Sequence, residues 1–344
     1  MTAATRGPAA TLRRDASSGV EEVTSGSRDG DTEAEFPHRR KDNKAPLLLL
    51  VNLKATRVNP RVVTAVRRAL GERFSVELVA TDGRGHAASL CRLARGFGAV
   101  AVLGGDGTIN EAANGLLGDD VPLACLPGGL TNVFARSLGL PTDAVAAAER
   151  LVALGGRPRS VDVGSVAGRC FLFASGLGLS ATLTRRHELG PRGAPGAAEA
   201  SATWAALRAI HEEFAQQRRL RVTTPEGTVE GTSVVAQNAE ALTYVGNHAL
   251  RVGCGAALDS RSLSLCVLRR ADPRELVTLA PRVLSGRAGA VAAHPRIASL
   301  PAVVWARVEA LDGTEVPLDT DGEYLGEHSS VEYRAIPGAL KVLV

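Results

Sequence analysis

The apolar positions along the chain follow two different periods. From Pro46 to Leu138, short apolar runs typical of buried strands alternate with segments in which apolar residues recur at helical spacing. The first strand is expected over 47–51 and the first helix over 60–71, where a glycine ends it. Further strands are expected over 74–80, 99–103 and 123–126, and further helices over 85–96, 110–117 and 132–138. Such repeats predict a parallel sheet with helices on both faces and ligands at the carboxyl ends of its strands.

After about residue 158, the period shifts toward two, which predicts antiparallel strands. Helical spacing returns in two stretches, about 197–217 and near 274–286, and the first of these interrupts the strands as an insertion. We therefore expect a β-sandwich in this half of the chain. Its strands are expected over 161–166, 170–175, 220–224, 228–236, 263–268, 303–310, 315–319 and 329–335.

These patterns predict a tail followed by two domains, with a fold class of α/β plus all-β. Residues 1–44 are rich in serine, threonine, glycine and charge, lack apolar periodicity, and are expected to form a disordered tail. The α/β nucleotide-binding domain is expected over 45–158, completed by part of 320–344, and the β-sandwich over 159–319. No apolar run approaches the ~20 residues of a membrane-spanning helix. The tail also lacks the apolar stretch of a secretory signal, so we expect a cytoplasmic protein.

The charge of the chain limits its partners. A formal net charge of +4 on 344 residues is too small to indicate a nucleic-acid-binding protein. The basic excess lies in residues 45–300, whereas residues 301–344 are acidic. The basic part fits contact with an anionic lipid surface, and an arginine-rich surface that only contacts solvent is the alternative. None of the four lysines follows a glycine, which excludes a P-loop.

The strongest candidate site is a glycine-rich turn after the strand over 99–103. Its sequence is Gly104-Gly105-Asp106-Gly107-Thr108-Ile109-Asn110-Glu111. Three glycines in four positions allow a sharp turn and a close approach of backbone N–H groups to a polyanion. The following helix directs its positive N-terminus at the same place. The turn therefore predicts a phosphate-binding site, and a plain turn in which Asp106 caps the helix is the alternative.

A second turn of the same kind lies between the next predicted strand and helix. Its sequence is Pro127-Gly128-Gly129-Leu130-Thr131-Asn132. Two neighbouring turns at the carboxyl ends of parallel strands form a cleft suited to the phosphates of a nucleotide. Thr131 and Asn132 are candidates for hydrogen bonds to that ligand, and capping of the following helix is the alternative for Asn132.

These two turns resemble the catalytic domain of the diacylglycerol kinase family, which is found in bacterial lipid kinases and sphingosine kinases. The segments that carry the resemblance are GGDGTINEAANGL and LPGGLTNVFARSLGLP. Shorter matches extend it over about residues 46–344, namely Thr81 with 85–87, 162–164, 235–238, and Asp321-Gly322-Glu323. Leu130 stands where the family usually has threonine, and only Asp259 remains in the loop that often holds a structural magnesium, so metal ligands stay unassigned.

The resemblance implies an enzyme that transfers the γ-phosphoryl group of ATP, with Mg²⁺, to the hydroxyl of diacylglycerol or a related lipid. It also implies a carboxylate that accepts the hydroxyl proton. The Asp321–Glu323 pair is the candidate for this base, and Asp106 is expected to act on magnesium or the acceptor. The residues expected to bind the nucleotide are Thr81, Gly104, Gly105, Asp106, Gly107, Thr108, Asn110, Glu111, Gly129, Thr131 and Asn132.

Several alternatives stay open. Asp-Gly is a common turn dipeptide, so Asp321-Gly322 is also consistent with a plain β-turn. The acceptor could instead be soluble, such as NAD, or the protein could be a catalytically weak lipid-binding or regulatory protein. The expected partner is a lipid at the inner membrane face, reached by peripheral contact, with a homodimer left open. The segment 176–181 imitates a dinucleotide-binding fingerprint, but without a strong helix pattern after it we expect a turn.

Overall fold

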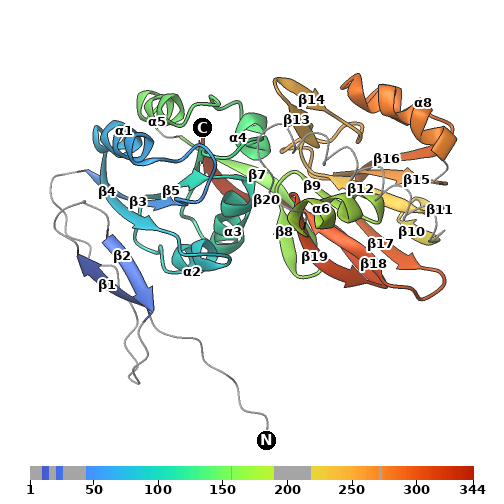
Figure 1. The fold of residues 1–344 in the computed structure, drawn as a ribbon, viewed down its shortest axis with the longest axis horizontal. Helices are drawn as coiled ribbons and strands as arrows, with labels where there is room; N and C mark the ends of the chain where they lie inside the picture. The colour runs from blue at the N-terminus through green and yellow to red at the C-terminus, as the bar shows by residue number, and fades with distance from the viewer. Residues whose placement is uncertain (1–9, 15–20, 26–43, 156, 190–217, 271–272) are drawn as a thin grey trace, which may run out of the picture. The chain divides into compact units, whose positions relative to one another are not determined.

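The computed structural model describes residues 10–14, 21–25, 44–155, 157–189, 218–270 and 273–344. The chain divides into two compact units (Figure 1). The first unit comprises residues 1–159 and 340–344, and the second comprises residues 160–339. The first has a mostly parallel sheet with helices and the second has antiparallel sheets, which confirms the expected fold class.

Four parallel strands form the centre of the first unit, in the order β4-β3-β5-β6. They are β3 (Ala45–Val51), β4 (Phe74–Ala80), β5 (Ala99–Gly104) and β6 (Leu123–Pro127). The C-terminal end of β20 (Ser330–Leu343) lies parallel to β6, where Val342 pairs with Leu123. Residues 47–51 are fully buried, as expected for a central parallel strand with both faces covered.

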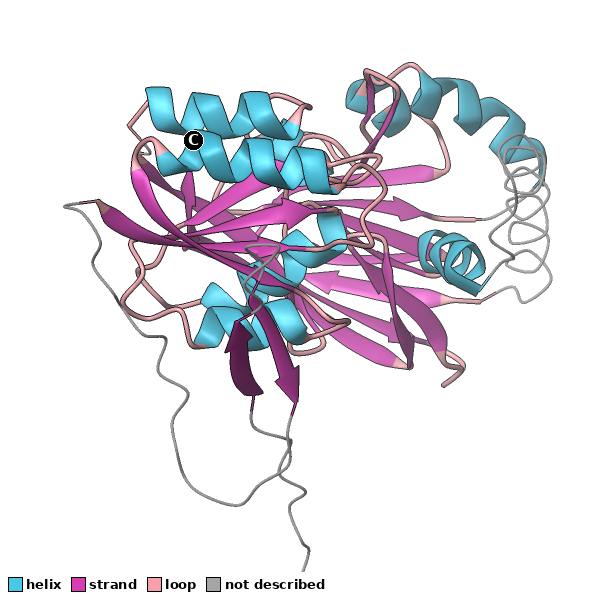
Figure 2. Ribbon diagram, turned by 60° about the vertical axis from the view of Figure 1, so that its left-hand side comes forward, coloured by secondary structure: helices cyan, strands magenta, loops and turns pink. Residues whose placement is uncertain are grey.

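Helices cover both faces of this sheet (Figure 2). On one face, α1 (Pro60–Gly71) and α5 (Ala144–Ala153) share a hydrophobic core with alternate residues of β3. On the other, α2 (His86–Arg92) and α3 (Asp106–Leu116) pack closely, since a Cβ atom on Gly115 would lie 2.5 Å from the carbonyl oxygen of Ala88. The short helix α4 (Val133–Ser137) follows β6. Helix α5 has no counterpart among the elements expected from the sequence.

The second unit has two antiparallel sheets that enclose a hydrophobic core. One sheet has the order β16-β15-β12-β9-β18-β19, and the other has β20-β17-β10-β11 with β7 and β8 attached. The strands of the first are β9 (Ala174–Leu177), β12 (Ser233–Gln237), β15 (Leu263–Leu268), β16 (Ile297–Val303), β18 (Val316–Thr320) and β19 (Glu323–His328). The second adds β7 (Pro158–Val166), β8 (Arg169–Phe171), β10 (Leu220–Thr224), β11 (Gly227–Gly231) and β17 (Trp305–Ala310) to β20.

Helices and a hairpin flank the sandwich. Helix α6 (Leu179–Leu189) contacts β9, β12, β18 and β19. Helix α8 (Pro273–Leu284) confirms the helix expected near 274–286, and α9 (Ala288–Ala292) packs beside it. Both helices contribute to a small hydrophobic core over β15 and β16. The hairpin of β13 (Thr243–Val245) and β14 (His248–Leu250) forms a separate two-stranded sheet.

Three expectations for the second unit are corrected. The strand expected over 170–175 is divided into β8 and β9, because the N–H groups of residues 172–174 donate to the Asp321 carboxylate. The strand expected over 228–236 is divided into β11 and β12, which belong to different sheets. The chain passes between these sheets at Gly231, where a Cβ atom would lie 2.7 Å from the carbonyl oxygen of Leu268. The turn expected over 176–181 is wrong, since β9 ends and α6 begins there.

Two segments expected from the sequence fall outside the described residues. They are most of the predicted tail 1–44 and the helical insertion about 197–217. Within the tail, β1 (Ala10–Arg14) and β2 (Glu21–Ser25) form an antiparallel pair that the sequence pattern does not predict. In the part of the chain that the structure describes, no helix is both long and apolar enough to cross a membrane.

Candidate functional site

The two glycine-rich turns of the first unit pack against each other through their backbones. The N–H of Gly128 donates to the carbonyl oxygen of Gly104 at 2.8 Å. A Cβ atom on Gly129 would lie 2.8 Å from the Cα of Gly105, and one on Gly128 would lie 2.7 Å from a methyl group of Val58. Any side chain at these positions would force the turns apart, so the glycines are required by the close approach.

The first turn leaves the N-terminus of α3 open. Gly105 is the N-cap residue in an extended conformation (φ −88°, ψ 178°), and no side chain caps the helix. Gly107 in the first turn of the helix is exposed. The first N–H groups of a helix lack partners within the helix, and an uncapped end can bind an anion. The alternative in which the Asp106 side chain caps its own helix is therefore wrong.

Asp106 instead joins the first turn to the second. Its Oδ2 accepts a hydrogen bond from the Thr131 hydroxyl at 3.0 Å, and its Oδ1 accepts one from the Phe134 N–H at 3.2 Å. Burial raises the pKa of Asp106, although the N–H groups of Val133 and Phe134 and the Thr131 hydroxyl act in the opposite direction. The carboxylate thus holds the start of α4 beside the open end of α3.

The second turn is closed by the side chain of Asn132. Its Oδ1 accepts the N–H of Gly129 and its Nδ2 donates to the carbonyl oxygen of Gly129, each at 2.8 Å. Asn132 itself adopts the left-handed conformation (φ 47°) and is buried. These bonds occupy both ends of the amide and the N–H of Gly129, and the side chain of Asn132 does not cap α4. Leu130 is 67% exposed, and Thr131 directs its hydroxyl to Asp106.

The other residues predicted to bind the nucleotide differ in their contacts. The Thr108 Oγ1 accepts a hydrogen bond at 2.8 Å from the Nδ2 of Asn52, a residue that sequence reasoning did not place in the site. Asn110 is buried, and its Oδ1 accepts from Asn114. Thr81 lies at the end of β4, where its N–H donates to Val51. Glu111 and Thr81 are half-buried and keep accessible surface.

In the second unit, Asp321 forms a buried turn. Asp321 and Gly322 both have positive φ values, 49° and 77°, and connect Thr320 to Glu323 as a two-residue hairpin. This is the turn that the sequence left as an alternative. The side chain does more than turn the chain, since its Oδ2 accepts the N–H of Leu172 at 2.6 Å. Its Oδ1 accepts the N–H groups of residues 173 and 174 at 2.9 and 3.1 Å.

The segment that binds Asp321 is itself held by two other matched motifs. The Nδ2 of Asn238, which is fully buried, donates to the carbonyl oxygens of Leu172 and Asp162, both at 2.8 Å. The carboxylate of Asp162 accepts the N–H groups of Arg261 and Gly338, the second at 2.8 Å. Three segments far apart in the sequence, 162–164, 235–238 and 321–323, therefore meet in one polar network.

Glu323 does not join that network. Its carboxylate forms an ion pair with Arg169, and both side chains are largely shielded from solvent. The two members of the expected pair are therefore in different surroundings, because one is bound by backbone N–H groups and the other by a guanidinium group.

Asp319 is a further buried carboxyl group that sequence reasoning missed. It lies in β18 two residues before Asp321 and is 5% exposed. Thr184 of α6 donates to its Oδ2 at 3.2 Å, and Ser180 also hydrogen-bonds to it. Burial raises the pKa of Asp319 to about 7, and the nearby Asp321 charge adds to this shift. The only signal in the sequence is a charged residue within an apolar strand.

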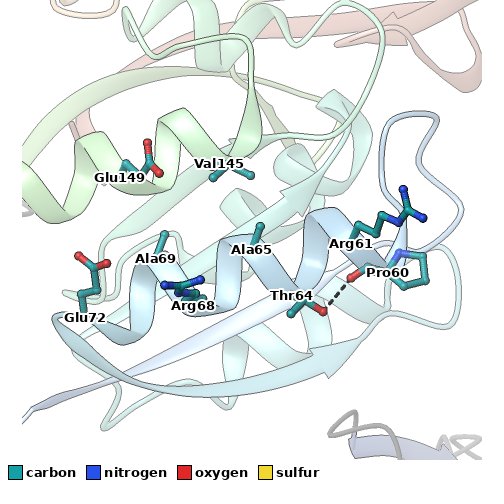
Figure 3. Close-up of a pocket in the computed structure, with 9 residues that line it drawn as sticks. All are labelled: Pro60, Arg61, Thr64, Ala65, Arg68, Ala69, Glu72, Val145 and Glu149. Atoms are coloured by element: carbon teal, nitrogen blue, oxygen red, sulfur yellow. Dashed lines mark hydrogen bonds between the residues drawn. The ribbon is translucent and has the colours of Figure 1, made fainter.

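A large groove of the first unit lies away from the predicted site residues. It has a volume of about 770 Å³ and lies between α1 and α5 (Figure 3). Its charged residues are Arg61, Arg68, Glu72 and Glu149, and none of the residues predicted to bind nucleotide or to catalyse lines it. The Thr64 hydroxyl in the groove donates to the carbonyl oxygen of Pro60. The groove is therefore separate from the site that the sequence predicts.

Two family models match nearly all of the chain after the tail. The model of the diacylglycerol kinase catalytic domain matches residues 46–166. The model of the YegS C-terminal NAD kinase beta sandwich-like domain matches residues 178–344. Each model thus falls mainly within one of the two units.

Individual proteins are similar over the same region. A Pseudomonas aeruginosa (strain UCBPP-PA14) protein named probable lipid kinase YegS-like is 30% identical over 304 residues, which are 88% of this chain and 94% of the relative. The diacylglycerol kinase of Bacillus subtilis (strain 168) is 42% identical over 101 residues, 29% of this chain and 33% of that protein. A crystal structure of a putative diacylglycerol kinase from Bacillus anthracis strain Sterne shares the fold, with a TM-score of 0.67 and 23% identity over 88% of this chain and 98% of that chain.

Proposed function

Because the chain belongs to the YegS-like family of lipid kinases, we propose that it transfers the γ-phosphoryl group of ATP to the hydroxyl group of a lipid. Diacylglycerol is the first acceptor to test, since the catalytic-domain model carries that name. The acceptor is proposed to be collected by peripheral contact with a membrane, from the cytoplasmic side.

The observation that carries the nucleotide part of the proposal is the pair of turns beside the open end of α3. The uncapped N-terminus and the exposed Gly107 offer backbone N–H groups to an anion without a lysine. The polar side chains around them are already oriented by internal hydrogen bonds, for example Thr131 on Asp106 and Asn52 on Thr108. Such a preorganised backbone suits phosphoryl transfer, which depends mainly on positioning and charge stabilisation.

We assign the general base to Asp321 rather than to Glu323. The Asp321 carboxylate is held in a fixed orientation by the N–H groups of residues 172–174, and proton transfer needs a carboxylate positioned in this way. Glu323 is already neutralised by Arg169. In the proposed reaction, the lipid hydroxyl oxygen forms a bond to the γ-phosphorus and its proton passes to Asp321. The bond between the γ-phosphorus and the bridging oxygen breaks, and ADP leaves with the electron pair of that bond on its oxygen.

Magnesium enters the proposal as part of MgATP. The described residues contain no group of three or more histidine, cysteine or acidic side chains that could hold a metal ion. Magnesium is commonly bound by one or two carboxylates together with the phosphates of the substrate. Asp106 is the carboxylate at the turns and the proposed ligand of this ion, and its oxygens also accept hydrogen bonds from the Thr131 hydroxyl and from backbone N–H groups of residues 132–134.

The test is a transfer assay with radiolabelled MgATP. Purified protein would be incubated with mixed micelles of diacylglycerol, with a total lipid extract, and with NAD in the absence of lipid. The proposal predicts label in a lipid product, which mass spectrometry of the extract would identify. Label in NAD without lipid would contradict it and favour a kinase for a soluble acceptor. ATP binding without any labelled product, or no ATP binding in calorimetry, would instead favour a lipid-binding protein without kinase activity.

A further inference from the structure

Helix α8 has apolar residues on two opposite faces. Leu279 and Val283 pack against the small core over β15 and β16. On the other side of the helix, Val277 is 75% exposed and Leu284 is 61% exposed. Helix neighbours lie three, four and seven positions apart, so one continuous surface is formed. We call this surface the outer face of α8, and its members are Val277, Ala280, Pro281 and Leu284, all of them exposed.

The β13–β14 hairpin extends this surface. The His248 Nε2 lies 2.9 Å from the carbonyl oxygen of Leu284, which fixes the hairpin beside the end of α8 (Figure 1). Val245 pairs with His248 across the hairpin and is 61% exposed. A surface helix of a globular protein normally presents polar side chains to water, whereas the outer face of α8 presents valine, leucine and proline. Contiguous exposed apolar surface of this kind marks an interaction site.

The charges around the outer face of α8 are mainly positive. Arg269 and Arg270 precede the helix and Arg287 follows it, and all three are exposed. None of them forms an ion pair with a residue that the structure describes. The nearby Glu240 is paired with Arg251 at 2.9 Å. In sequence, residues 269–287 contain five arginines and two acidic residues.

An apolar strip with arginines at its border has the chemistry of proteins that bind the interface of an anionic bilayer. We infer that the outer face of α8, together with Val245, is the surface by which this protein docks on a membrane containing anionic phospholipid. The apolar side chains enter the interface and the guanidinium groups contact lipid phosphates. The inference rests on the proposed function, because a lipid kinase has to collect its acceptor from a membrane.

The experiment is flotation of the full-length protein with vesicles, without ATP. One set of vesicles is phosphatidylcholine and the other contains phosphatidylglycerol in addition. We expect binding to the anionic vesicles that falls with added salt. The double variant Val277→Asp/Leu284→Asp should bind at least about ten-fold more weakly, since two apolar side chains leave the interface. Arg269→Gln and Arg287→Gln should each weaken binding about five-fold.

The matched control is Leu154→Asp, which places the same charge at a 49% exposed leucine of the first unit and should bind as the unchanged protein does. Thermal unfolding of each variant checks that the helix still folds. The inference is overturned if the double variant binds like the unchanged protein. It is also overturned if the double variant dissociates a dimer in sedimentation and keeps its vesicle binding, which would make the face a contact between two copies of the chain.

Different experimental results would contradict the docking surface and the proposed function. Phosphorylation of lipid in mixed micelles with no binding to anionic vesicles would overturn the docking surface and support the kinase. Vesicle binding that depends on Val277 and Leu284, with no phosphoryl transfer to any lipid, would support the surface and contradict the kinase. In micelles, where the acceptor is dispersed, the double variant should keep the unchanged activity.

Discussion

Asp106 in the first unit and Asp321 in the second are both shielded carboxylates that accept backbone N–H groups, but their partners come from different distances along the chain. Asp106 accepts hydrogen bonds from Thr131 and Phe134, which lie 25 and 28 residues later in the chain, in and just after the second glycine-rich turn. Asp321 is bound by N–H groups 147 to 149 residues earlier. The first arrangement follows from adjacent strand–helix units, and the second exists only after the whole sandwich has closed.

The two regions obtain their rigidity by different means. The first uses glycines at which a Cβ atom would overlap a neighbouring backbone, as at Gly129. The second uses a buried polar network in which Asn238 joins the strand of Asp162 to the segment that binds Asp321. Backbone contact suits the binding of phosphates, and a fixed carboxylate suits proton transfer.

The largest expected effect is that of Asp321→Asn on turnover. Asparagine tolerates the left-handed conformation but cannot accept the proton of the lipid hydroxyl. We expect kcat to fall about 10²- to 10⁴-fold in the micelle assay. The free energy of unfolding should fall by about 1–3 kcal/mol, because one of the three N–H groups loses its acceptor. Glu323→Gln is the comparison, and a larger loss in that variant would transfer the role of base to Glu323.

The next largest effect concerns the stability of the second unit. The folded pKa of Asp319 is raised to about 7 from 3.8, so the folded protein binds this proton more tightly than the unfolded chain. Its contribution to stability is present below about pH 4 and is lost as the pH rises to about 7. Asp319→Asn removes the charge, and should raise the unfolding free energy at pH 8 by up to about 4 kcal/mol, the equivalent of three pKa units.

Urea denaturation of Asp319→Asn and the unchanged protein at pH 5 and pH 8 measures this difference. The shifted pKa of Asp106 is present in both proteins and cancels in the comparison. The same stability difference at both pH values would contradict the assignment of a proton to Asp319.

In the first unit, Gly129→Ala should weaken ATP binding about 100-fold in calorimetry. The new methyl group would lie 2.8 Å from the Cα of Gly105 and would push the two turns apart. Gly71→Ala at the end of α1 is the control, since a Cβ atom there meets no atom within 4 Å. Unchanged ATP affinity in Gly129→Ala would show that the contact of the turns is not needed for the nucleotide.

The smallest effect is that of Thr131→Val. The variant keeps the shape of the side chain and removes the hydroxyl that donates to Asp106. We expect a loss of about 0.5–1.5 kcal/mol in unfolding free energy and a few-fold lower kcat. Thr64→Val is the matched control, because that hydroxyl only bonds to its own helix at Pro60 and the variant should change stability by less than about 0.5 kcal/mol. Equal effects of the two substitutions would contradict a special role for the bond to Asp106.

The sequence predicts the first region better than the second for a physical reason. The turn over 104–111 is a continuous segment whose strand, glycines and helix are all visible in order, and the structure contains them. The side-chain bonds of Asn132 to Gly129 could not be predicted, because the same residue is equally suited to cap a helix. In the second region, the break of the expected strand over 170–175 depends on Asp321, which the sequence does not connect to it.

The most direct test of this division between the regions is the ATP affinity of Asp321→Asn, measured by calorimetry beside Gly129→Ala. If the first unit binds the nucleotide and the second supplies the base, Asp321→Asn should bind MgATP within about two-fold of the unchanged protein while its kcat falls by two to four orders of magnitude. A loss of ATP affinity in Asp321→Asn, together with normal affinity in Gly129→Ala, would contradict this division of roles between the two units.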